Sequence, residues 1–417
     1  MVQIATHPQR ATGAPLGGYA IFAALLSAAG LPLYIHAPKF YVDEYGVSLA
    51  ALGAVLFALR LLDVVQDPLL GRLAGLVARY RTTAVTIGVV VLCAGMVGLF
   101  AVPPVFGAVL WFGLMLTLVF SAFSFLTICF YAQGVATGSD LPGEGHLTLA
   151  RWRETGALLG VCAAAIAPVA LGAYLSAPFT GFAVGFAVLG LIAAFAMRHA
   201  WDTSRIPEGP GFAVILRDSQ ARRLLLIALV NAAPVAVSST LFLFFVESRL
   251  GAAGSEGILL LLFFFSAACS APLWSLLAQR FGTRNTLLTA MVLAVCAFGF
   301  ALGLGTGDTL AFAVICAASG AAMGADLTLL PAAFSARMAK IAPGAAEGFG
   351  LWSFVSKLSL AFAAVALLPL LESGGFRSGT ENSESALRLL TLLYAGVPCA
   401  LKLVAITLLI TTRLDEG

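Results

Sequence analysis

Three charged side chains stand in a segment that is otherwise apolar enough to lie in a membrane. Arg60, Asp63 and Asp67 occur within VLFALRLLDVVQDPLLG. On a helix, their spacing points all three within about 60° of one direction. A charge at the centre of a bilayer costs at least about 2.5–3.5 kcal/mol on insertion scales, so three on one face need a reason. A polar cavity between helices, where carboxylates hold a cation or a proton, would provide it, and this is the chemistry of a coupled transporter.

The two carboxylates are one helical turn apart, which sets what they can bind. Asp63 and Asp67 can share one cation with hydroxyl or amide oxygens. The spacing suits a hard monovalent ion, or a proton held by the mutual repulsion of two carboxylates. The alternative is a structural salt bridge with Arg60 or Lys357 that only locks helices together. We favour coupling, because a buried ion pair stabilises a fold poorly.

A lysine farther along the chain offers an opposing charge. Lys357 lies midway along the apolar stretch FGLWSFVSKLSLAFAAVALL. We expect it to reach toward Asp63 and Asp67 and to neutralise them when the cation is absent. The alternative is a lysine whose stem packs on apolar neighbours while its amine reaches the membrane surface, which is difficult from mid-span.

The composition assigns the chain to the polytopic membrane proteins. Of its 417 residues, 60% are hydrophobic and only 10% are charged, and the mean hydropathy is +1.00. A soluble protein of this size cannot hide so much apolar surface. The net charge of +3 comes from Arg and Lys in short loops, so we expect no nucleic-acid partner.

No motif in the sequence indicates an enzyme or a cofactor site. There is no P-loop, no GxGxxG fingerprint and no HExxH motif. The seven cysteines fall in apolar segments without a CxxC or a Cys/His cluster, so we interpret them as small buried hydrophobes. We therefore expect no enzymatic activity, no cofactor, and no metal beyond Na+ as one of two candidate coupling ions, the other being H+.

Twelve stretches are long enough to cross a bilayer core of about 30 Å, which takes roughly 20 apolar residues per helix. They run approximately over residues 15–40, 47–77, 83–102, 105–137, 146–175, 178–199, 221–248, 256–279, 285–306, 309–338, 345–371 and 386–412. A polar stretch at 199–223 separates the sixth from the seventh. We expect an all-α membrane protein with a six-helix bundle at 1–200, a cytoplasmic linker at 201–220 and a second six-helix bundle at 221–417.

The two halves of the chain echo each other. The segment at 68–85, PLLGRLAGLVARYRTTAV, resembles the segment at 272–288, PLWSLLAQRFGTRNTLL. Their separation is near half the length of the chain, which indicates that one bundle is a duplicate of the other. With the N-terminus in the cytoplasm, the other side keeps only Lys39, Arg249, Arg377 and Arg388 among its loop cations. The positive-inside rule therefore predicts that both termini are cytoplasmic. Twelve helices, the repeat and the basic central loop together predict the major facilitator architecture.

Other charged and aromatic side chains give weaker signals. Arg153 opens the fifth span, where contact with a substrate and snorkelling at the membrane boundary both stay open. Tyr131 and Trp352 can stack on a sugar or another ring, although most aromatic residues in such chains face lipid or neighbouring helices. Asp326 and Lys402 are interpreted as members of a local pair or as interface anchors.

The stretch FYVDEYGVSLAALGAVLFALRLLDVVQDPLLGRL (40–73) carries a family resemblance. It resembles the opening signature of the glycoside–pentoside–hexuronide:cation symporters, typified by the melibiose permease. Their second-helix pattern, Arg-x-x-Asp-x-x-x-Asp-Pro-x-x-Gly, is matched by Arg60, Asp63, Asp67, Pro68 and Gly71. PGAAEGFGLWSFVSKLSLAFAA (343–364) and ARWRETGALLG (150–160) extend the resemblance over nearly the whole chain.

The resemblance implies roles for residues around the cation. Asp63 and Asp67 would be the cation-site carboxylates, and Gln66 would be a neighbouring ligand. Arg60 and Lys357 would tune or compensate their charges.

The resemblance also bears on the substrate. Arg153 would be the substrate-site arginine of the fifth helix. Galactoside transporters of the family bind sugar hydroxyls with two aspartates, and Ser27 and Thr127 stand in their places here. Melibiose itself is therefore not the expected substrate. With Tyr131 and Trp352, these residues complete the candidate substrate contacts.

The sequence as a whole predicts a secondary active transporter that carries a sugar, a glycoside or a similar small organic solute together with Na+ or H+ by alternating access. The alternatives are a proton-driven exporter, a carrier of lysolipid-like amphiphiles, and a non-transporting membrane sensor of the same fold. We expect the partners to be the small-molecule substrate and the lipid of the bacterial inner membrane. We expect the monomer to be the functional unit.

Overall fold

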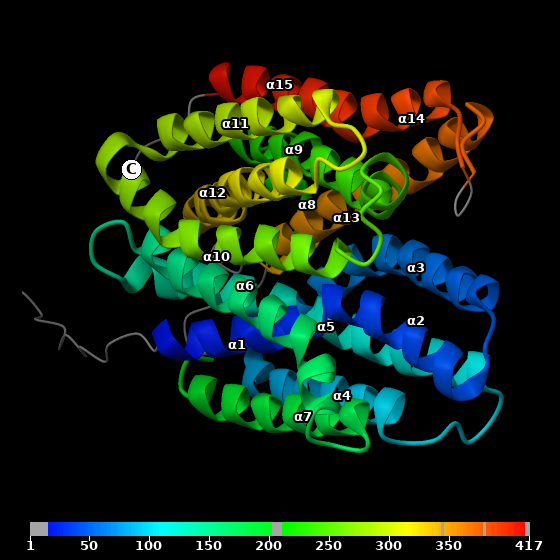
Figure 1. Ribbon diagram of the computed structural model, residues 1–417. Helices are drawn as coiled ribbons and strands as arrows, with labels where there is room; N and C mark the ends of the chain where they lie inside the picture. The colour runs from blue at the N-terminus through cyan, green and yellow to red at the C-terminus, as the bar shows by residue number, and fades with distance from the viewer. Residues whose placement is uncertain (1–15, 202–210, 343–345, 378–380, 413–417) are drawn as a thin grey trace, which may run out of the picture.

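A computed structural model describes residues 16–201, 211–342, 346–377 and 381–412. Within these ranges the chain is helical and contains no strand. The start of α1 and the end of α15 lie at the same end of the helix array (Figure 1).

The described residues of the first half form seven α-helices, all on one side of the molecule (Figure 1). They are α1 (Leu16–Ala28), α2 (Leu31–Tyr45), α3 (Leu49–Leu76), α4 (Arg81–Phe100), α5 (Ala108–Asp140), α6 (Gly145–Gly172) and α7 (Pro178–Met197).

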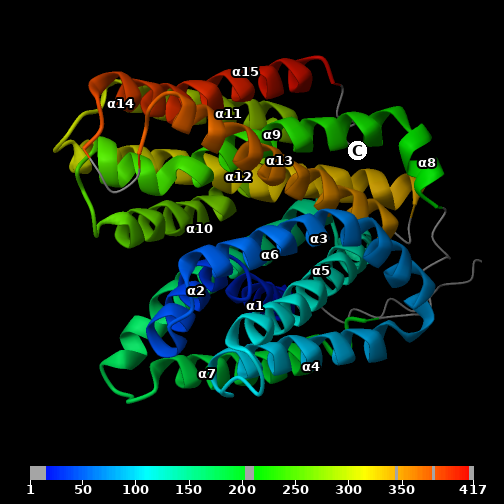
Figure 2. The same cartoon turned by 90° about the vertical axis from the view of Figure 1, so that its right-hand side faces the viewer.

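The helices after residue 211 lie on the other side of the molecule, as the view turned by 90° also shows (Figure 2). They are α8 (Phe212–Arg217), α9 (Ser219–Phe244), α10 (Glu256–Phe281), α11 (Thr283–Gly299), α12 (Thr309–Ile341), α13 (Ala346–Ser373), α14 (Glu384–Thr391) and α15 (Val397–Ile410). A π-helical turn at Leu392–Gly396 makes α14 and α15 one continuous run.

The structure differs from the sequence-based prediction in two segments. The first span, 15–40, is divided into α1 and α2 because Gly30 separates them and a proline stands in the first turn of α2. The predicted linker at 201–220 contains the short helix α8 and the start of α9, where Asp218 accepts a hydrogen bond from the Ala221 amide. Residues 202–210 of that linker lie outside the described residues.

Nine helical segments in the described part of the chain are long and apolar enough to cross a membrane. α1 and α2 are shorter pieces, and α3 and α13, which carry Asp63, Asp67 and Lys357, are not among the nine. The number of twelve spans therefore stays a prediction. Large apolar side chains cover the outside of the array, for example Leu191, Phe195 and Leu310, which are 72%, 66% and 80% exposed. Such a surface fits lipid rather than water.

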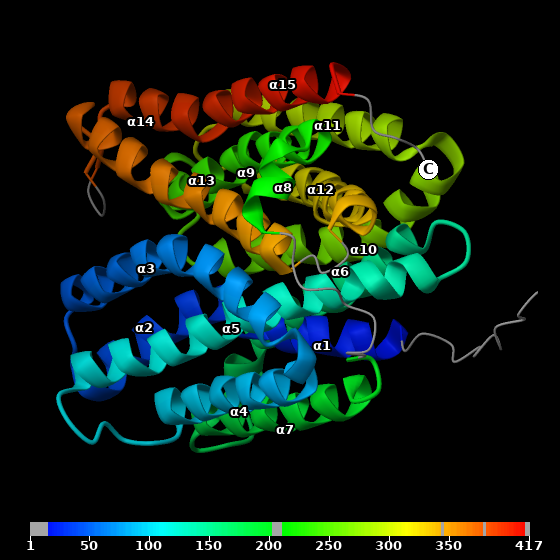
Figure 3. The same ribbon diagram turned by 180° about the vertical axis from the view of Figure 1, so that it is seen from behind.

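The two halves approach each other most closely where α3 passes α13 (Figure 3). A Cβ atom on Gly71 of α3 would lie 3.1 Å from the Cα of Gly350 on α13, and one on Gly350 would lie 3.1 Å from the carbonyl oxygen of Asp67. Glycine at both positions lets the two backbones meet almost directly. The crossing is one helical turn from Asp67, so it also fixes how far side chains of α13 must reach to contact α3.

Candidate functional site

The two carboxylates predicted from the sequence lie side by side in the central part of α3. Asp63 is 3% exposed and Asp67 is 0% exposed. Gln66 lies between them in the sequence, and its Nε2 donates a hydrogen bond to Asp63 Oδ1 at 2.8 Å. The side chain of Arg60 lies outside the described part of the structure, so its role stays a prediction.

Lys357 of α13 reaches this carboxylate pair from the other half of the molecule. Its Nζ lies 3.1 Å from Asp67 Oδ1 and 3.0 Å from Asp67 Oδ2. The distance to Asp63 Oδ1 is 3.6 Å. Ser353, one turn earlier on α13, donates its hydroxyl to Asp67 Oδ2 at 2.5 Å. The expected proximity of Lys357 to both carboxylates is therefore observed.

One face of α5 supplies hydroxyl groups to the same cluster. Ser121 donates to the Gln66 side-chain oxygen at 2.9 Å, and Ser124 accepts a hydrogen bond from Lys357 Nζ at 2.7 Å. The spacing of three residues puts both serines on one side of the helix. Sequence reasoning missed Ser121, Ser124 and Ser353. The three-residue spacing on α5 was a signal, but it indicates a face of the helix and not what that face contacts.

Four oxygen atoms thus surround the Lys357 ammonium: Ser124 Oγ, both carboxylate oxygens of Asp67, and Asp63 Oδ1. Hard monovalent cations prefer ligands of this kind. The oxygens around the ammonium would therefore also suit a cation of this kind, and a cation bound there would displace the ammonium. Because Lys357 belongs to α13 and the carboxylates belong to α3, such a displacement would affect the contact between the two halves.

A second polar group lies two turns farther along α5. Arg153 of α6 is 3% exposed, and its Nε contacts Glu154 Oε1 at 2.7 Å. Its guanidinium lies over the Tyr131 ring at 3.9 Å from the centroid, and the Tyr131 hydroxyl donates to Glu154 Oε1 at 3.0 Å. Arg153 is eight residues inside α6, about 12 Å from its start. This position and its burial argue against snorkelling at the membrane boundary, and contact with a substrate stays a prediction.

One nitrogen of that guanidinium has no partner in the described part of the chain. Arg153 Nη2 is buried and forms no hydrogen bond there. The hydroxyl of Thr127, one turn before Tyr131 on α5, is likewise buried without a partner among the described residues. Both groups therefore keep hydrogen-bonding capacity that the described residues do not use.

Two other predicted residues are placed differently. Trp352 of α13 is half-buried and packs on Phe334 with ring centroids 4.9 Å apart. Phe349, one turn earlier, packs on Tyr131 at 5.1 Å, so α13 also contacts the Arg153 group. Ser27 lies at the end of α1 and is half-buried, and its side chain makes no hydrogen bond to the described residues. The structure does not bring Ser27 into contact with Lys357 or with the two carboxylates that it binds.

Within the described ranges, no group of three or more His, Cys, Asp or Glu side chains could hold a metal ion. A cavity lies elsewhere, among helices α9, α10, α11, α12 and α15.

Comparisons with known proteins agree on the kind of protein. A family model described as MFS/sugar transport protein matches residues 16–416. Among solved structures, the chain is similar to a bacterial homologue of the iron transporter ferroportin in its outward-facing state, with a TM-score of 0.69 and 13% identity. That match covers 95% of this chain and 98% of the other. The same homologue with soaked iron matches with a TM-score of 0.69, 13% identity and coverage of 95% and 99%. No curated protein matches the chain.

Proposed function

Because the chain belongs to the MFS/sugar transport protein family, the family of the glycoside–pentoside–hexuronide:cation symporters, we propose that it is a cation-coupled symporter of a sugar, a glycoside or a similar small organic solute. The family and the major facilitator fold expected from the sequence are confirmed. The chain is a multi-pass membrane protein of the transporter class. The coupling ion is Na+ or H+, held at Asp63 and Asp67.

A single observation carries this proposal. The ammonium of Lys357 lies among four oxygens, two of which belong to fully buried Asp67. A buried ion pair is a weak stabiliser, so its presence at the contact between the halves favours a working role. When a cation takes the place of the ammonium, Lys357 withdraws and the tie between α3 and α13 is lost. Ion occupancy thereby changes the relative stability of two arrangements of the halves.

The solute is proposed to bind near Arg153. Tyr131 supplies an aromatic face, and Thr127 and Arg153 supply polar atoms without described partners. Phe349 of α13 contacts Tyr131, so a solute at this place touches both halves. One α5 face joins the two sites, because Ser124 contacts Lys357 and Tyr131 contacts Glu154. Trp352 lies one turn from Phe349 on α13 and belongs to the proposed solute contacts.

The proposed location is the bacterial inner membrane with both termini in the cytoplasm. The start of α1 and the end of α15 lie at the same end of the molecule (Figure 1). The excess of Arg and Lys in the loops on that side supports this orientation.

The test is uptake into proteoliposomes from a panel of sugars and small organic solutes, under an imposed Na+ gradient or an imposed pH gradient. One gradient should drive uptake of at least one solute, and Asp63→Asn should abolish that uptake. Glu372→Gln, which removes an exposed carboxylate at the far end of α13, is the matched control and should transport normally.

Undiminished gradient-driven uptake by Asp63→Asn would overturn the cation-site assignment. If solutes bind but none moves under any gradient, the protein is a membrane sensor of the same fold instead. Transport of solutes in the export direction alone would favour the proton-driven exporter.

A further inference from the structure

A cavity of about 60 Å3 lies wholly within the second half of the molecule. Its walls come from α9, α10, α11, α12 and α15, and none of its lining residues belongs to the first half. It is therefore separate from Asp63, Asp67 and Arg153. At roughly 15 Å3 for each water centre, the volume accommodates about four water molecules in a row, or a solute with a single ring or a short chain.

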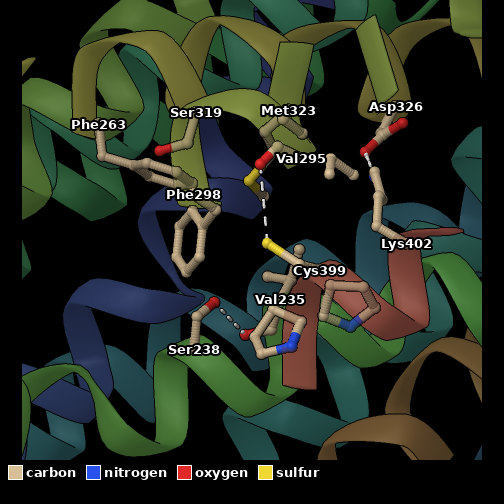
Figure 4. Close-up of a pocket in the computed structure, with 13 residues that line it drawn as sticks. Val235, Ser238, Phe263, Val295, Phe298, Ser319, Met323, Asp326, Cys399 and Lys402 are labelled. Atoms are coloured by element: carbon tan, nitrogen blue, oxygen red, sulfur yellow. Dashed lines mark hydrogen bonds and ion pairs between the residues drawn. The ribbon is translucent and has the colours of Figure 1, made fainter. Parts of the chain in front are cut away.

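The cavity is polar at two ends and apolar between them (Figure 4). Asp326 and Lys402 lie at one end, and Ser238 and Ser319 lie toward the other. Between these ends are apolar and sulfur-containing side chains, with aromatic rings beside the serines. These intervening residues are Val295, Met323, Cys399, Phe263 and Phe298.

The charged end is already balanced. Lys402 Nζ donates to Asp326 Oδ2 and, at 2.6 Å, to Asn231 Oδ1. Lys402 is 5% exposed and Asp326 is 9% exposed. A ligand that brought a net charge here would leave that charge buried without a counterion, which is costly at this depth in a membrane protein. The balance therefore selects a neutral ligand. An ammonium has three N–H donors, and two of those on Lys402 are in use, so one stays available.

The serine end offers acceptors. Ser319 donates its hydroxyl to the Ile315 carbonyl at 2.7 Å, and Ser238 donates to the Val235 carbonyl at 3.2 Å. With their protons committed to their own helices, both oxygens keep lone pairs for a donor. Asp326 Oδ1 is buried without a hydrogen-bond partner among the described residues. At the charged end a ligand can therefore accept a hydrogen bond from Lys402 or donate one to Asp326, and near the serines it must donate one. A hydroxyl group can do either.

We propose that this cavity is a second binding site, specific for a compact neutral solute with a hydroxyl group at each end of an apolar ring or short chain. The apolar middle packs between Val295, Met323 and the Phe298 ring. One hydroxyl accepts from Lys402, and the other donates to Ser319 or Ser238. The site goes beyond the proposed symport function and does not depend on the cation cluster.

Saturation-transfer NMR on the purified full-length protein in nanodiscs tests the proposal, with empty nanodiscs as the blank. The probe is trans-1,4-cyclohexanediol. Two charged analogues of the same shape are 4-hydroxycyclohexanecarboxylate and the ammonium form of 4-aminocyclohexanol. The diol should bind, and each charged analogue should bind at least about tenfold more weakly, because the charge would be buried unpaired.

Variants locate the binding. Ala294→Phe fills the cavity from α11 and should weaken diol binding at least about tenfold, because the added ring takes up its volume. Val292→Phe adds the same ring on the 49%-exposed outer face of α11 and should bind the diol as the unaltered protein does. Ser319→Ala removes one acceptor and should weaken binding severalfold. Asp63→Asn should leave diol binding intact, which separates this site from the symport proposal.

Absence of diol binding, equal binding by Ala294→Phe, or tighter binding of a charged analogue would each overturn the proposal. If Ala294→Phe fails to fold, the comparison of the three ligands on the unaltered protein still decides.

Discussion

Two buried lysine–aspartate pairs occur in this protein, and they differ in what they connect. Lys357 of α13 is shared by Asp63 and Asp67 of α3, across the contact between the two halves. Lys402 of α15 pairs with Asp326 of α12 and also contacts Asn231 of α9, all within the second half. Both pairs lie among apolar helices; their carboxylates and Lys402 are buried, whereas the Lys357 side chain is 14% exposed.

The difference teaches which buried charge is built to change partners. A pair inside one half moves with that half, so its contacts can persist through the transport cycle, and it acts as a fixed part of the fold. A cluster that spans the halves must break whenever they move relative to each other. The cluster between the halves also places two carboxylates around one ammonium, whereas Lys402 pairs with the single carboxylate of Asp326.

Neutralising one aspartate of each pair should give the largest effects. One variant should lose uptake and the other should lose stability. Asp67→Asn removes a cation ligand, and the loss of about 3 kcal/mol corresponds to an uptake reduction of about 100-fold. Asp326→Asn leaves Lys402 buried without its counterion, which should lower the free energy of unfolding by about 3–5 kcal/mol. Uptake per folded molecule should persist in Asp326→Asn.

Uptake and thermal unfolding measured on the same preparations check this contrast. Asp67→Asn should melt close to the unaltered protein, because Lys357 keeps Asp63 as a partner. Equal losses of stability in the two variants would mean that both pairs are structural.

Removing the lysines should separate the pairs by their response to ions. Lys357→Met leaves Asp63 and Asp67 without the ammonium, so a cation must take its place. A cation at about 100 times its dissociation constant adds about 2.7 kcal/mol of stability. We therefore expect thermal unfolding of Lys357→Met to depend strongly on Na+ or on acid. Lys402→Met should be less stable than the unaltered protein but should show no such dependence.

The measurement is a series of unfolding curves in NaCl against choline chloride at equal ionic strength, repeated from neutral to mildly acidic pH. A matching ion response in both lysine variants would contradict the distinction between the two pairs.

A bulky side chain at the contact of the halves should have a smaller effect, without any change of charge. In Gly71→Leu the Cβ alone would lie 3.1 Å from Gly350 Cα and 3.2 Å from the Ala346 carbonyl oxygen. The added side chain should therefore hold α3 away from α13, stretch the Lys357 contact and reduce uptake by about tenfold.

Gly75→Leu is the matched control, one turn farther along α3, where an added Cβ meets no atom within 4 Å. It should transport as the unaltered protein does. If both leucine variants are equally active, close approach of these helices is not needed for transport.

The fold and the two carboxylates of α3 could be predicted from the sequence because those signals are local. Apolar runs give helices, and the spacing of Asp63 and Asp67 places both on one face of a helix. The break at Gly30 was also visible in the sequence, yet an apolar run of this length favoured one continuous span.

The rest depends on contacts between distant residues. Asp326 and Lys402 are 76 positions apart, and Lys357 and Ser124 are 233 apart, so no spacing rule pairs them. The spacing of Ser121 and Ser124 indicated only a face of a helix, and Ser353 gave no signal, because serine is common in membrane helices and often bonds its own backbone. Lys357 was the exception, since a mid-membrane charge requires a partner and Asp63 and Asp67 were the nearest match in type.

A third pair, at the edge of the second half, should show the smallest effect and sharpen the role of burial. Asp218 caps α9 by accepting from the Ala221 amide at 2.7 Å, and it accepts from Arg337 Nε of α12 at 3.0 Å. The hydrogen bond from Arg337 holds the pKa of Asp218 below its ordinary value. The carboxylate therefore contributes stability that is complete above about pH 4 and is lost as pH falls through the lowered pKa of the folded state.

Asp218→Asn keeps a good helix cap and removes only the charge, so it should cost about 0.5 kcal/mol near neutral pH. That difference from the unaltered protein should shrink below about pH 4, as unfolding curves between acidic and neutral pH would show. Arg337→Gln should reproduce the loss, and the double variant should add little to it. A loss as large as that of Asp326→Asn would show that burial does not separate these two pairs, and a loss that persists in acid would assign it to the cap.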